Sequence, residues 1–208
     1  MSITCYSIYG KQTERVNSLK AIGINGSPRT TGNTFFLLST VLGELELRGI
    51  DTQLIQAGGR DIHGCIACGK CRKSSVPRCA FDDDIINEAL SAIEDADILI
   101  LGSPVYFGGL SAQMKAFIDR VGYVCRPHKL LKGKICASVS AARRNGALVA
   151  FNSMNNLFTI SEGIIVGSNY WNQGVGGAIG DAANDEEGVQ TMKTLGQNIA
   201  DVAMALKK

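Results

Sequence analysis

This sequence has no large excess of charge of either sign, few histidines and prolines, and no long apolar runs. Its 208 residues include 21 Lys and Arg against 19 Asp and Glu, and the net charge of +2 gives no basic footprint for nucleic acid or a membrane surface. No apolar run approaches the ~20 residues that span a bilayer. The 2 histidines lie in no Ser-His-Asp or Cys-His pattern, which argues against nucleophilic hydrolysis.

Signals for secretion and for disulfide bonds are missing as well. Residues 1–10 lack the basic region and long apolar stretch of a signal peptide. The chain has 7 cysteines, and an odd number without a secretion signal is poorly explained by disulfides. We therefore expect a cytoplasmic protein whose reduced thiols serve metal binding or redox chemistry.

The order of the expected elements predicts the fold class. Apolar strand-like runs alternate with segments of helical periodicity, as in a parallel sheet covered on both faces. Strands are expected at residues 19–25, 52–57, 98–102, 134–140 and 162–166, with a long loop at 167–185 before the last helix. Five such units predict an α/β, flavodoxin-like doubly wound five-stranded parallel sheet in the order 2-1-3-4-5, with helices on both faces.

One domain accounts for most of the chain. Residues 19–208 are expected to form a single domain with a cysteine-rich insertion at residues 63–81. Residues 1–18 are interpreted as an N-terminal arm that packs on a partner subunit, or as a frayed end. The run Asp82–Asp84 predicts the N-cap and acidic first turn of the helix after the insertion.

The loop after the first strand has the composition of a phosphate-binding loop. Within residues 26–34, Gly26 and Gly32 let the backbone approach an anion closely, and Arg29 supplies a permanent charge. Further donors are the hydroxyls of Ser27, Thr31 and Thr34 and the helix N–H groups that begin near Asn33. The pattern is neither G-x-G-x-x-G nor G-x-x-x-x-G-K-[ST], so a terminal phosphate monoester is the expected ligand. The alternative is a Ser/Thr-capped helix after a tight turn.

Four cysteines are concentrated in the insertion. Cys65, Cys68 and Cys71 are separated by two-residue gaps, and Cys79 returns after a seven-residue loop. This spacing suits a [4Fe–4S] cluster, because one turning loop can supply several thiolates to a small volume. Zinc is one alternative, and reduced thiols without any cluster are another. The insertion follows the second strand, so it should emerge at the same sheet edge as the phosphate loop.

Two motifs and the four cysteines resemble a known family. The Gly-Ser-Pro-Arg…Gly-Asn-Thr loop at 26–34 resembles the FMN phosphate loop of NAD(P)H-dependent FMN reductases and flavodoxin-like quinone reductases. Gly-Ser-Pro-Val-Tyr-Phe-Gly at 102–108, followed by Lys-Ala-Phe-Ile-Asp-Arg at 115–120, is similar to their second flavin loop and its helix. The cysteines narrow the resemblance to the iron–sulfur flavoprotein branch.

The resemblance implies a set of cofactor contacts. The phosphate would be bound by Ser27, Arg29, Asn33 and Thr34, with Gly32 in the same loop. The flavin ring and ribityl chain would lie against Pro104, Val105, Tyr106, Phe107 and Gly108, with Arg143 and Asn145 near the other edge of the ring. Tyr170 and Trp171 would cover the site from the last loop or from a neighbouring subunit, or would form a hydrophobic plug under that loop.

Three functional hypotheses follow. The first is an FMN-dependent oxidoreductase that transfers electrons between FMN, a [4Fe–4S] cluster and a protein or small-molecule acceptor, with no residue assigned as general acid or base. The second is a flavin-only NAD(P)H-dependent FMN or quinone reductase without a cluster. The third is a non-enzymatic flavodoxin-like electron carrier, which the near-neutral composition disfavours. Family relatives assemble as dimers or tetramers, so the resemblance also implies a homodimer or homotetramer.

Overall fold

The computed structural model describes residues 18–207, and except for Ser18 the expected N-terminal arm lies outside them. All strand pairs of the sheet are parallel, and the order is β2-β1-β3-β4-β5, with β6 also paired to β4. The strands are β1 Lys20–Asn25, β2 Asp51–Gln56, β3 Ile98–Pro104, β4 Ile135–Ala142, β5 Ile164–Ile165 and β6 Gln173–Val175. The predicted doubly wound sheet is confirmed, with one additional strand.

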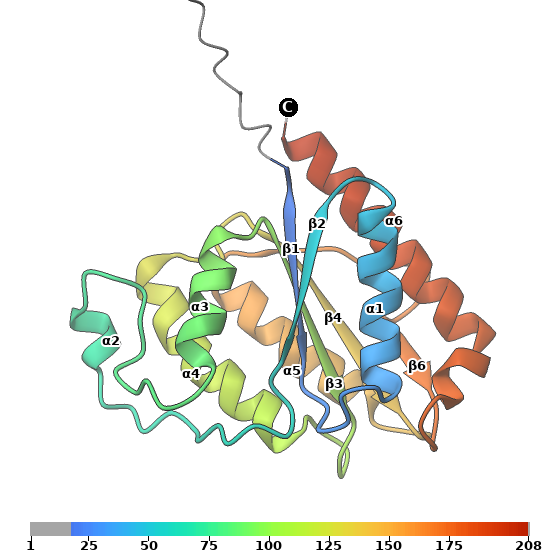
Figure 1. Ribbon diagram of the computed structural model, residues 1–208, viewed down its shortest axis with the longest axis horizontal. Helices are drawn as coiled ribbons and strands as arrows, with labels where there is room; N and C mark the ends of the chain where they lie inside the picture. Colours follow the sequence, from blue (N-terminus) through green and yellow to red (C-terminus); the bar gives the residue numbers. More distant parts are fainter. Residues whose placement is uncertain (1–17, 208) are drawn as a thin grey trace, which may run out of the picture.

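Helices cover both faces of the sheet, as Figure 1 shows. On one face lie α1 and α6, and on the other lie α3, α4 and α5. The helices are α1 Asn33–Glu46, α2 Lys70–Lys73, α3 Ile86–Asp95, α4 Ala112–His128, α5 Ala147–Ile160 and α6 Glu186–Leu206, with a 3₁₀ turn at Asp181–Asn184. None of the helices in this described part is long and apolar enough to cross a membrane.

Two hydrophobic cores hold these layers together. Every residue of β3 and β4 is buried, in keeping with the apolar run that opens β3 and the small and apolar residues of β4. Leu38 and Val41 of α1 join Leu195 of α6 in one core, and Phe117 and Val121 of α4 belong to the other. Because the strands are parallel, their carboxyl ends lie at one edge of the sheet, where the loops that follow them meet.

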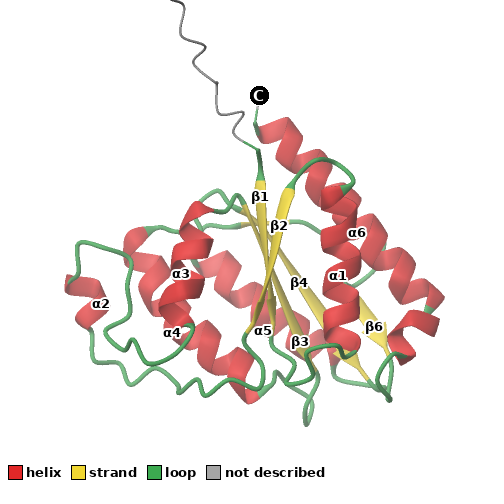
Figure 2. Ribbon diagram, in the orientation of Figure 1, coloured by secondary structure: helices red, strands yellow, loops and turns green. Residues whose placement is uncertain are grey.

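The fifth strand position differs from the prediction. The strand expected at 162–166 is reduced to β5, which pairs with the start of β4, while β6 pairs with the end of β4 at Ser140–Ala142. The segment 167–185 is therefore not strand-free (Figure 2). The short sequence Gln-Gly-Val carries little strand propensity, so its pairing depends on the exposed edge of β4 and was not visible in the sequence.

The start of α3 also corrects a prediction. The helix begins at Ile86, and its N-cap residue Ile85 makes no side-chain cap bond. Asp84 instead accepts a hydrogen bond from the Ile86 N–H at 3.0 Å, and its second oxygen binds Arg120 of α4. The acidic run thus serves a tertiary contact as well as the helix start.

Candidate functional site

The loop between β1 and α1 is held from below by two polar side chains at strand ends. Asn25 accepts a hydrogen bond from the Ser27 N–H at 3.0 Å and donates to Gln56 Oε1 at 2.8 Å. Gln56 in turn donates to the carbonyls of Ser27 and Gly58, at 2.6 and 2.7 Å. The two side chains are register partners across β1 and β2. These bonds hold the loop in place without a ligand, and neither residue was predicted from the sequence.

Glycine is required where this loop is packed most closely. A Cβ at Gly58 would lie 2.1 Å from the carbonyl carbon of Ser27, and one at Gly26 would lie 2.8 Å from the Cβ of Met114. The Gly26 N–H also donates to the Gly102 carbonyl at 2.8 Å, which ties the loop to the end of β3. The backbone therefore forms a cradle with no room for side chains beneath the ligand.

The predicted cofactor residues gather around two adjoining hollows at the carboxyl ends of the strands. A hollow of about 160 Å³ is lined by Ser27, Arg29, Asn33, Thr34, Pro104, Val105, Tyr106, Ala141, Arg143, Gly176 and Gly177. The neighbouring hollow of about 290 Å³ is lined by Val105, Phe107, Gly108, Arg143, Arg144 and Asn145. Every predicted cofactor residue except Gly32 lines one of them, and Gly32 is the N-cap of α1. The loop after β6 and Arg144 are additions to the predicted set.

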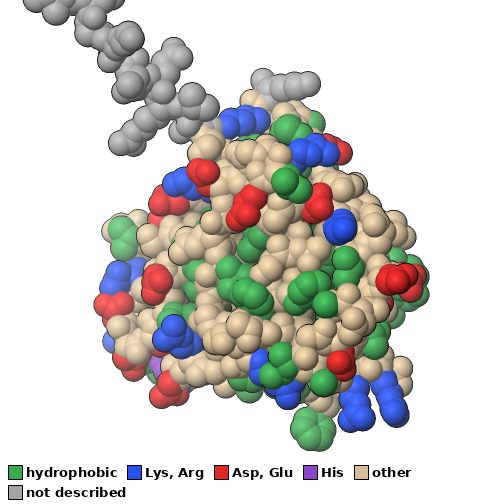
Figure 3. Space-filling model, turned by 45° about the vertical axis from the view of Figure 1, so that its right-hand side comes forward, with side chains coloured by type: hydrophobic (Ala, Val, Ile, Leu, Met, Phe, Trp, Pro, Cys, Tyr) green, Lys and Arg blue, Asp and Glu red, His purple; other side chains and the backbone are tan. Residues whose placement is uncertain are grey.

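The first hollow has the donors that a phosphate requires. The N-cap of α1 makes no side-chain cap bond, so the first N–H groups of the helix face this edge with the positive end of the helix dipole. Ser27 and Thr34 are buried here, whereas Arg29 and Arg143 are exposed on the rim. Figure 3 shows Lys and Arg side chains at this lower end of the molecule. The arrangement suits a dianionic phosphate next to a less polar ring.

Asn33 makes contacts that the sequence did not predict. Its Nδ2 donates to the Ala178 carbonyl at 2.9 Å, and its Oδ1 accepts from the N–H groups of Gly180 and Ala182 at 3.0 and 3.3 Å. A Cβ at Gly176 would lie 2.6 Å from Asn33 Nδ2. The side chain therefore holds the loop after β6 over the hollow, and its contact with phosphate stays a prediction.

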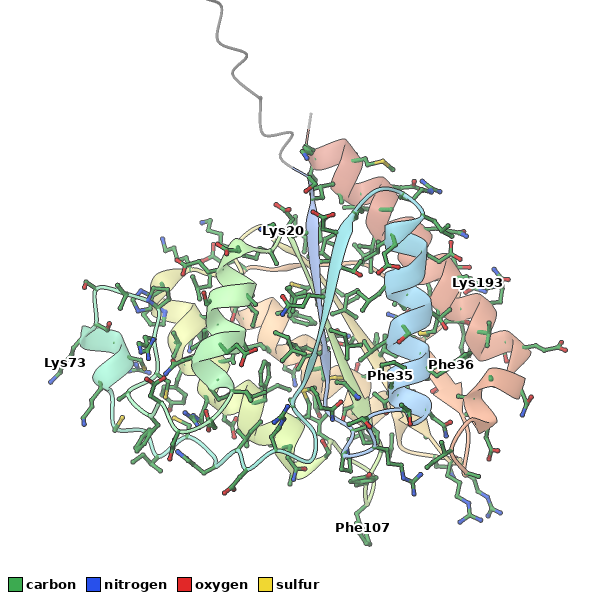
Figure 4. The ribbon with its side chains drawn as sticks, in the orientation of Figure 1. Lys20, Phe35, Phe36, Lys73, Phe107 and Lys193 are labelled. Carbon is green, nitrogen blue, oxygen red and sulfur yellow. The ribbon has the colours of Figure 1, made fainter. Side chains whose placement is uncertain are left out.

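The second predicted flavin loop ends in a tight turn. The backbones of Tyr106 and Gly109 exchange two hydrogen bonds of 3.0 Å around Phe107 and Gly108, whose φ values are 48° and 80°. Two successive positive φ values define a type I′ turn, a conformation that an aromatic residue adopts only with strain. The Phe107 side chain is fully exposed and points away from the fold (Figure 4). It contributes to the rim of the outer hollow and is not buried in it.

The four insertion cysteines line one small hollow. Cys65, Cys68, Cys71 and Cys79 line one hollow of about 20 Å³ against α4. Burial raises the pKa of the Cys71 thiol, and the neighbouring Cys79, Cys65 and Cys68 raise it further. Cys68 remains exposed at the outer edge. The four thiols share this hollow, and their role as metal ligands stays a prediction, whereas Cys125 and Cys136 are buried elsewhere in the core.

Hydrogen bonds to sulfur order this segment. The Ala67 N–H donates to Cys65 Sγ at 3.4 Å, and Arg120 Nη2 donates to Cys79 Sγ at 3.3 Å. Asn87 of α3 brackets the Cys79 backbone, accepting from its N–H at 2.8 Å and donating to its carbonyl at 3.2 Å. Such donors stabilise thiolates and are a known determinant of iron–sulfur potentials.

The geometry of the cysteine site bears on which metal group fits. Tetrahedral zinc with Zn–S bonds of ~2.3 Å brings sulfurs to within about 3.8 Å of one another. Within residues 18–207, the three ligand atoms found mutually within 4.8 Å belong to His63, Asp83 and Asp84, and no cysteine trio meets that limit. Asp84 is already bound to Arg120. As folded, the thiols are therefore not drawn together around a single metal ion.

The size of the hollow sets a condition on that group. About 20 Å³ is the room of a single water, so the segment has to open outward to admit a cluster. Ile66 and Cys68 lie exposed on the outer side of the loop and have space to move. The four thiols supply the donor chemistry of an iron–sulfur group, but the hollow as folded has no room for one.

Helix α4 connects the two sites. Its N-cap Ser111 donates to the Gly26 carbonyl at 2.7 Å, and Arg120 of the same helix contacts Cys79. Nine residues separate Ser111 and Arg120, which is about 14 Å along a helix at 1.5 Å per residue. The insertion leaves the sheet at the predicted edge, but its cysteines pack against the middle of α4 and not beside the phosphate loop.

Other surface features do not collect the predicted residues. Hollows of about 820 and 840 Å³ lie at the amino ends of β1 and β4 and between α4 and α5. Tyr170 and Trp171 contact each other at a tilt of 58° with ring centres 4.8 Å apart, and each is 48% exposed, so they do not form a buried plug. Neither ring lines the two cofactor hollows.

Comparison with known proteins places the chain in a family. The sequence pattern of the NADPH-dependent FMN reductase family matches residues 19–177. An iron-sulfur flavoprotein of Methanocaldococcus jannaschii is 38% identical over 91% of this chain and 100% of its own length. One of Methanosarcina thermophila is 31% identical over 91% of this chain and 98% of its own.

A solved structure supports the fold independently. RosB, crystallised with 8-demethyl-8-formylriboflavin-5'-phosphate, matches 91% of this chain and 81% of its own, with a TM-score of 0.71 at 17% identity. Because the identity is low, this similarity concerns the fold alone. The family match and the two sequence relatives carry the assignment further: this chain belongs to the NADPH-dependent FMN reductase family of flavin-dependent oxidoreductases, in its iron–sulfur flavoprotein branch.

Proposed function

We propose that this protein binds FMN at the carboxyl edge of the sheet and exchanges electrons between FMN, a [4Fe–4S] cluster on Cys65, Cys68, Cys71 and Cys79, and a protein or small-molecule acceptor. The observation that carries the proposal is the pair of hollows lined by nearly all the predicted cofactor residues. The names of the relatives, iron-sulfur flavoproteins, support the same combination.

The chain's own residues would divide the work of binding FMN. Ser27, Thr34 and the first N–H groups of α1 would hold the phosphate, and Arg29 would neutralise its charge. Val105 and Tyr106 would lie against the ring, and the loop held by Asn33 would limit access of water from the side of β6. Bound FMN supplies the redox chemistry, accepting and releasing up to two electrons.

A flavin-only NAD(P)H-dependent reductase is the second candidate. The small volume between the cysteines favours it, because the segment as folded holds no space for a cluster. The nicotinamide would then approach the flavin through the open side of the outer hollow, next to Arg143 and Arg144. In both cases the protein is an FMN-dependent oxidoreductase.

Assembly and compartment belong to the same proposal. Ile164 and Ile165 of the edge strand β5 are partly exposed, as are Tyr170 and Trp171 in the loop that follows. This apolar edge supports a homodimer or homotetramer, which light scattering of the purified chain would measure. The 6 described cysteines are all free, in keeping with a reducing cytoplasm.

FMN binding is tested by comparing two ligands that differ in one group. Removal of the phosphate removes several charge-assisted hydrogen bonds, so we expect riboflavin to bind at least ~100-fold more weakly than FMN. Arg29→Met should weaken FMN about tenfold and leave riboflavin unchanged, whereas the surface control Arg48→Met should change neither. Equal affinity for both ligands in the wild type would contradict the phosphate site.

The cluster is tested by composition. Anaerobically purified protein should contain iron and sulfide in equal amounts and little zinc, with broad visible absorption in addition to the flavin bands. Reduction of the bound flavin by NADPH or NADH in protein that lacks iron would instead favour the flavin-only reductase.

A further inference from the structure

Arg120 is a charged side chain on the core face of α4. It lies three residues after Phe117 and one before Val121, both fully buried, and its own side chain is 1% exposed. Burial of a guanidinium is strongly unfavourable unless charges and hydrogen bonds compensate for the lost water. The position therefore demands partners, and these partners all come from the cysteine segment and the turn before α3.

The partners surround the guanidinium on several sides. Nη1 binds the carboxylate of Asp84, whose side chain is 3% exposed. Nη2 donates to Cys79 Sγ at 3.3 Å and to the Phe81 carbonyl at 3.4 Å, and the Phe81 ring centre lies 5.8 Å from the guanidinium carbon. Asp84 pairs with one end of the guanidinium, and the donor at the other end faces sulfur and a carbonyl.

One buried donor has no partner. Arg120 Nε makes no hydrogen bond among the described residues, and Arg120 is one of the residues that line the cysteine hollow. An unpaired buried donor of a charged group is destabilising by itself. Its place beside four thiols is explained if the hollow holds a negatively charged group when the protein is in its working state.

We propose that Arg120 is a positioning residue of the cysteine site: it fixes Cys79 as a ligand and offsets the negative charge of the sulfur-bound group. The inference rests on the proposed function for the identity of that group as an iron–sulfur cluster. A positive charge and N–H donors next to cluster sulfurs stabilise the more negative, reduced state, so Arg120 raises the cluster's reduction potential. Asp84 holds the guanidinium in place from the opposite side.

A merely structural ion pair would behave differently. If the pair of Arg120 and Asp84 only joined α4 to the turn before α3, its loss would lower the stability of the fold and leave the properties of an assembled cluster unchanged. Because the two roles differ in what they change, the potential of the cluster and its retention separate them.

The experiment uses the full chain with FMN and a cluster reconstituted anaerobically. Arg120→Met should shift the midpoint potential of the cluster, measured by EPR-monitored titration, to more negative values and speed loss of iron to a chelator ~10- to 100-fold. Arg120→Lys keeps the charge without the forked donors and should give intermediate values. FMN affinity should stay unchanged in both, which also reports that the fold is intact.

The matched control is Arg126→Met, an exposed arginine on the same helix, which should leave potential and retention as in the wild type. A wild-type potential and iron retention in Arg120→Met would overturn the inference and leave the proposed function standing. If only the lysine variant folds, wild-type values in that variant would have the same consequence. A wild type that takes up no cluster would overturn the cluster assignment and this inference together.

Discussion

The hydroxyl of Ser111 donates a 2.7 Å hydrogen bond to the carbonyl of Gly26, which joins the start of α4 to the phosphate loop. The same oxygen accepts the N–H of Met114 at 3.2 Å and is the N-cap of the helix. Ser111 is fully buried, so water does not take over the hydrogen bonds of its hydroxyl when the hydroxyl is removed. One side chain thus serves the helix that reaches the cysteines and the loop that faces the phosphate.

Ser111→Ala should therefore affect both stability and cofactor binding. Loss of the cap and an unsatisfied buried carbonyl should lower the free energy of unfolding by about 2–3 kcal/mol, measured in urea. FMN affinity should fall as well, because the Gly26 backbone is less constrained. Ser153→Ala is the control, since its hydroxyl makes a single exposed bond to the Val149 carbonyl. Equal unfolding midpoints in the two variants would contradict the assigned role.

Asn33 offers a second test, because its predicted and observed contacts differ. Asn33→Ala removes three hydrogen bonds to the loop at 178–182, so the ligand-free chain should lose about 1–2 kcal/mol of stability. The amides of that loop should exchange with deuterium faster. If Asn33 acted only on phosphate, the ligand-free protein would be unchanged and FMN affinity alone would fall. Gln190→Ala is a matched control, because the Gln190 side chain makes an exposed hydrogen bond to Thr194.

The order of the strands in the sheet was predictable, because the apolar runs and the helical periodicity that mark each element depend on local residue order. The cysteine segment and both predicted flavin loops could also be identified in the sequence, because each is one contiguous stretch of residues. What the sequence could not show is pairing between stretches. Asn25 and Gln56 become partners only once the register of β1 and β2 is known. The strand β6 exists only because β5 ends early and leaves the edge of β4 open.

The helical spacing of apolar residues in α4 indicates in the sequence itself that Arg120 is important. Met114, Phe117 and Val121 mark the core face of the helix by their spacing, and Arg120 falls on the same face. A charge at a core position signals a buried partner, although the sequence does not identify Cys79 and Asp84 as that partner. The sequence likewise indicated an acidic residue at the start of α3 but not that Asp84 also binds Arg120.

Phe107 should be replaceable with a gain in stability. Asn adopts positive φ more easily than Phe, so Phe107→Asn should raise the free energy of unfolding by about 0.5–1 kcal/mol. Unchanged FMN affinity in this variant would count against the predicted contact of Phe107 with the flavin, because the side chain points into solvent (Figure 4) although it lines the rim of the outer hollow. Phe107→Leu retains a side chain with the same backbone strain and should show no gain. A loss of stability in the asparagine variant would mean that the exposed ring makes contacts within the assembled protein.

The two core thiols give the fold a defined response to alkaline pH. Burial raises the pKa of Cys125 and of Cys136 from 9.0 to about 12, and for Cys125 the neighbouring Cys136 adds to the effect. In the unfolded chain both titrate near pH 8.5–9. Each folded pKa lies above the unfolded one, so the stabilisation is fully present below about pH 9 and is lost as pH rises toward 12.

The free energy of unfolding should therefore fall between pH 9 and 12, with each thiol contributing up to about 1.4 kcal/mol per pH unit. Urea titrations of the metal-free chain with reductant would measure this slope. The double variant Cys125→Ala, Cys136→Ala should be less stable at pH 7, because it leaves cavities, yet its stability should fall less steeply above pH 9. Cys68→Ala, which removes an exposed thiol, should keep the wild-type slope. If the double variant lost stability as steeply as the wild type, ionisation of the core thiols would not be the cause of alkaline unfolding.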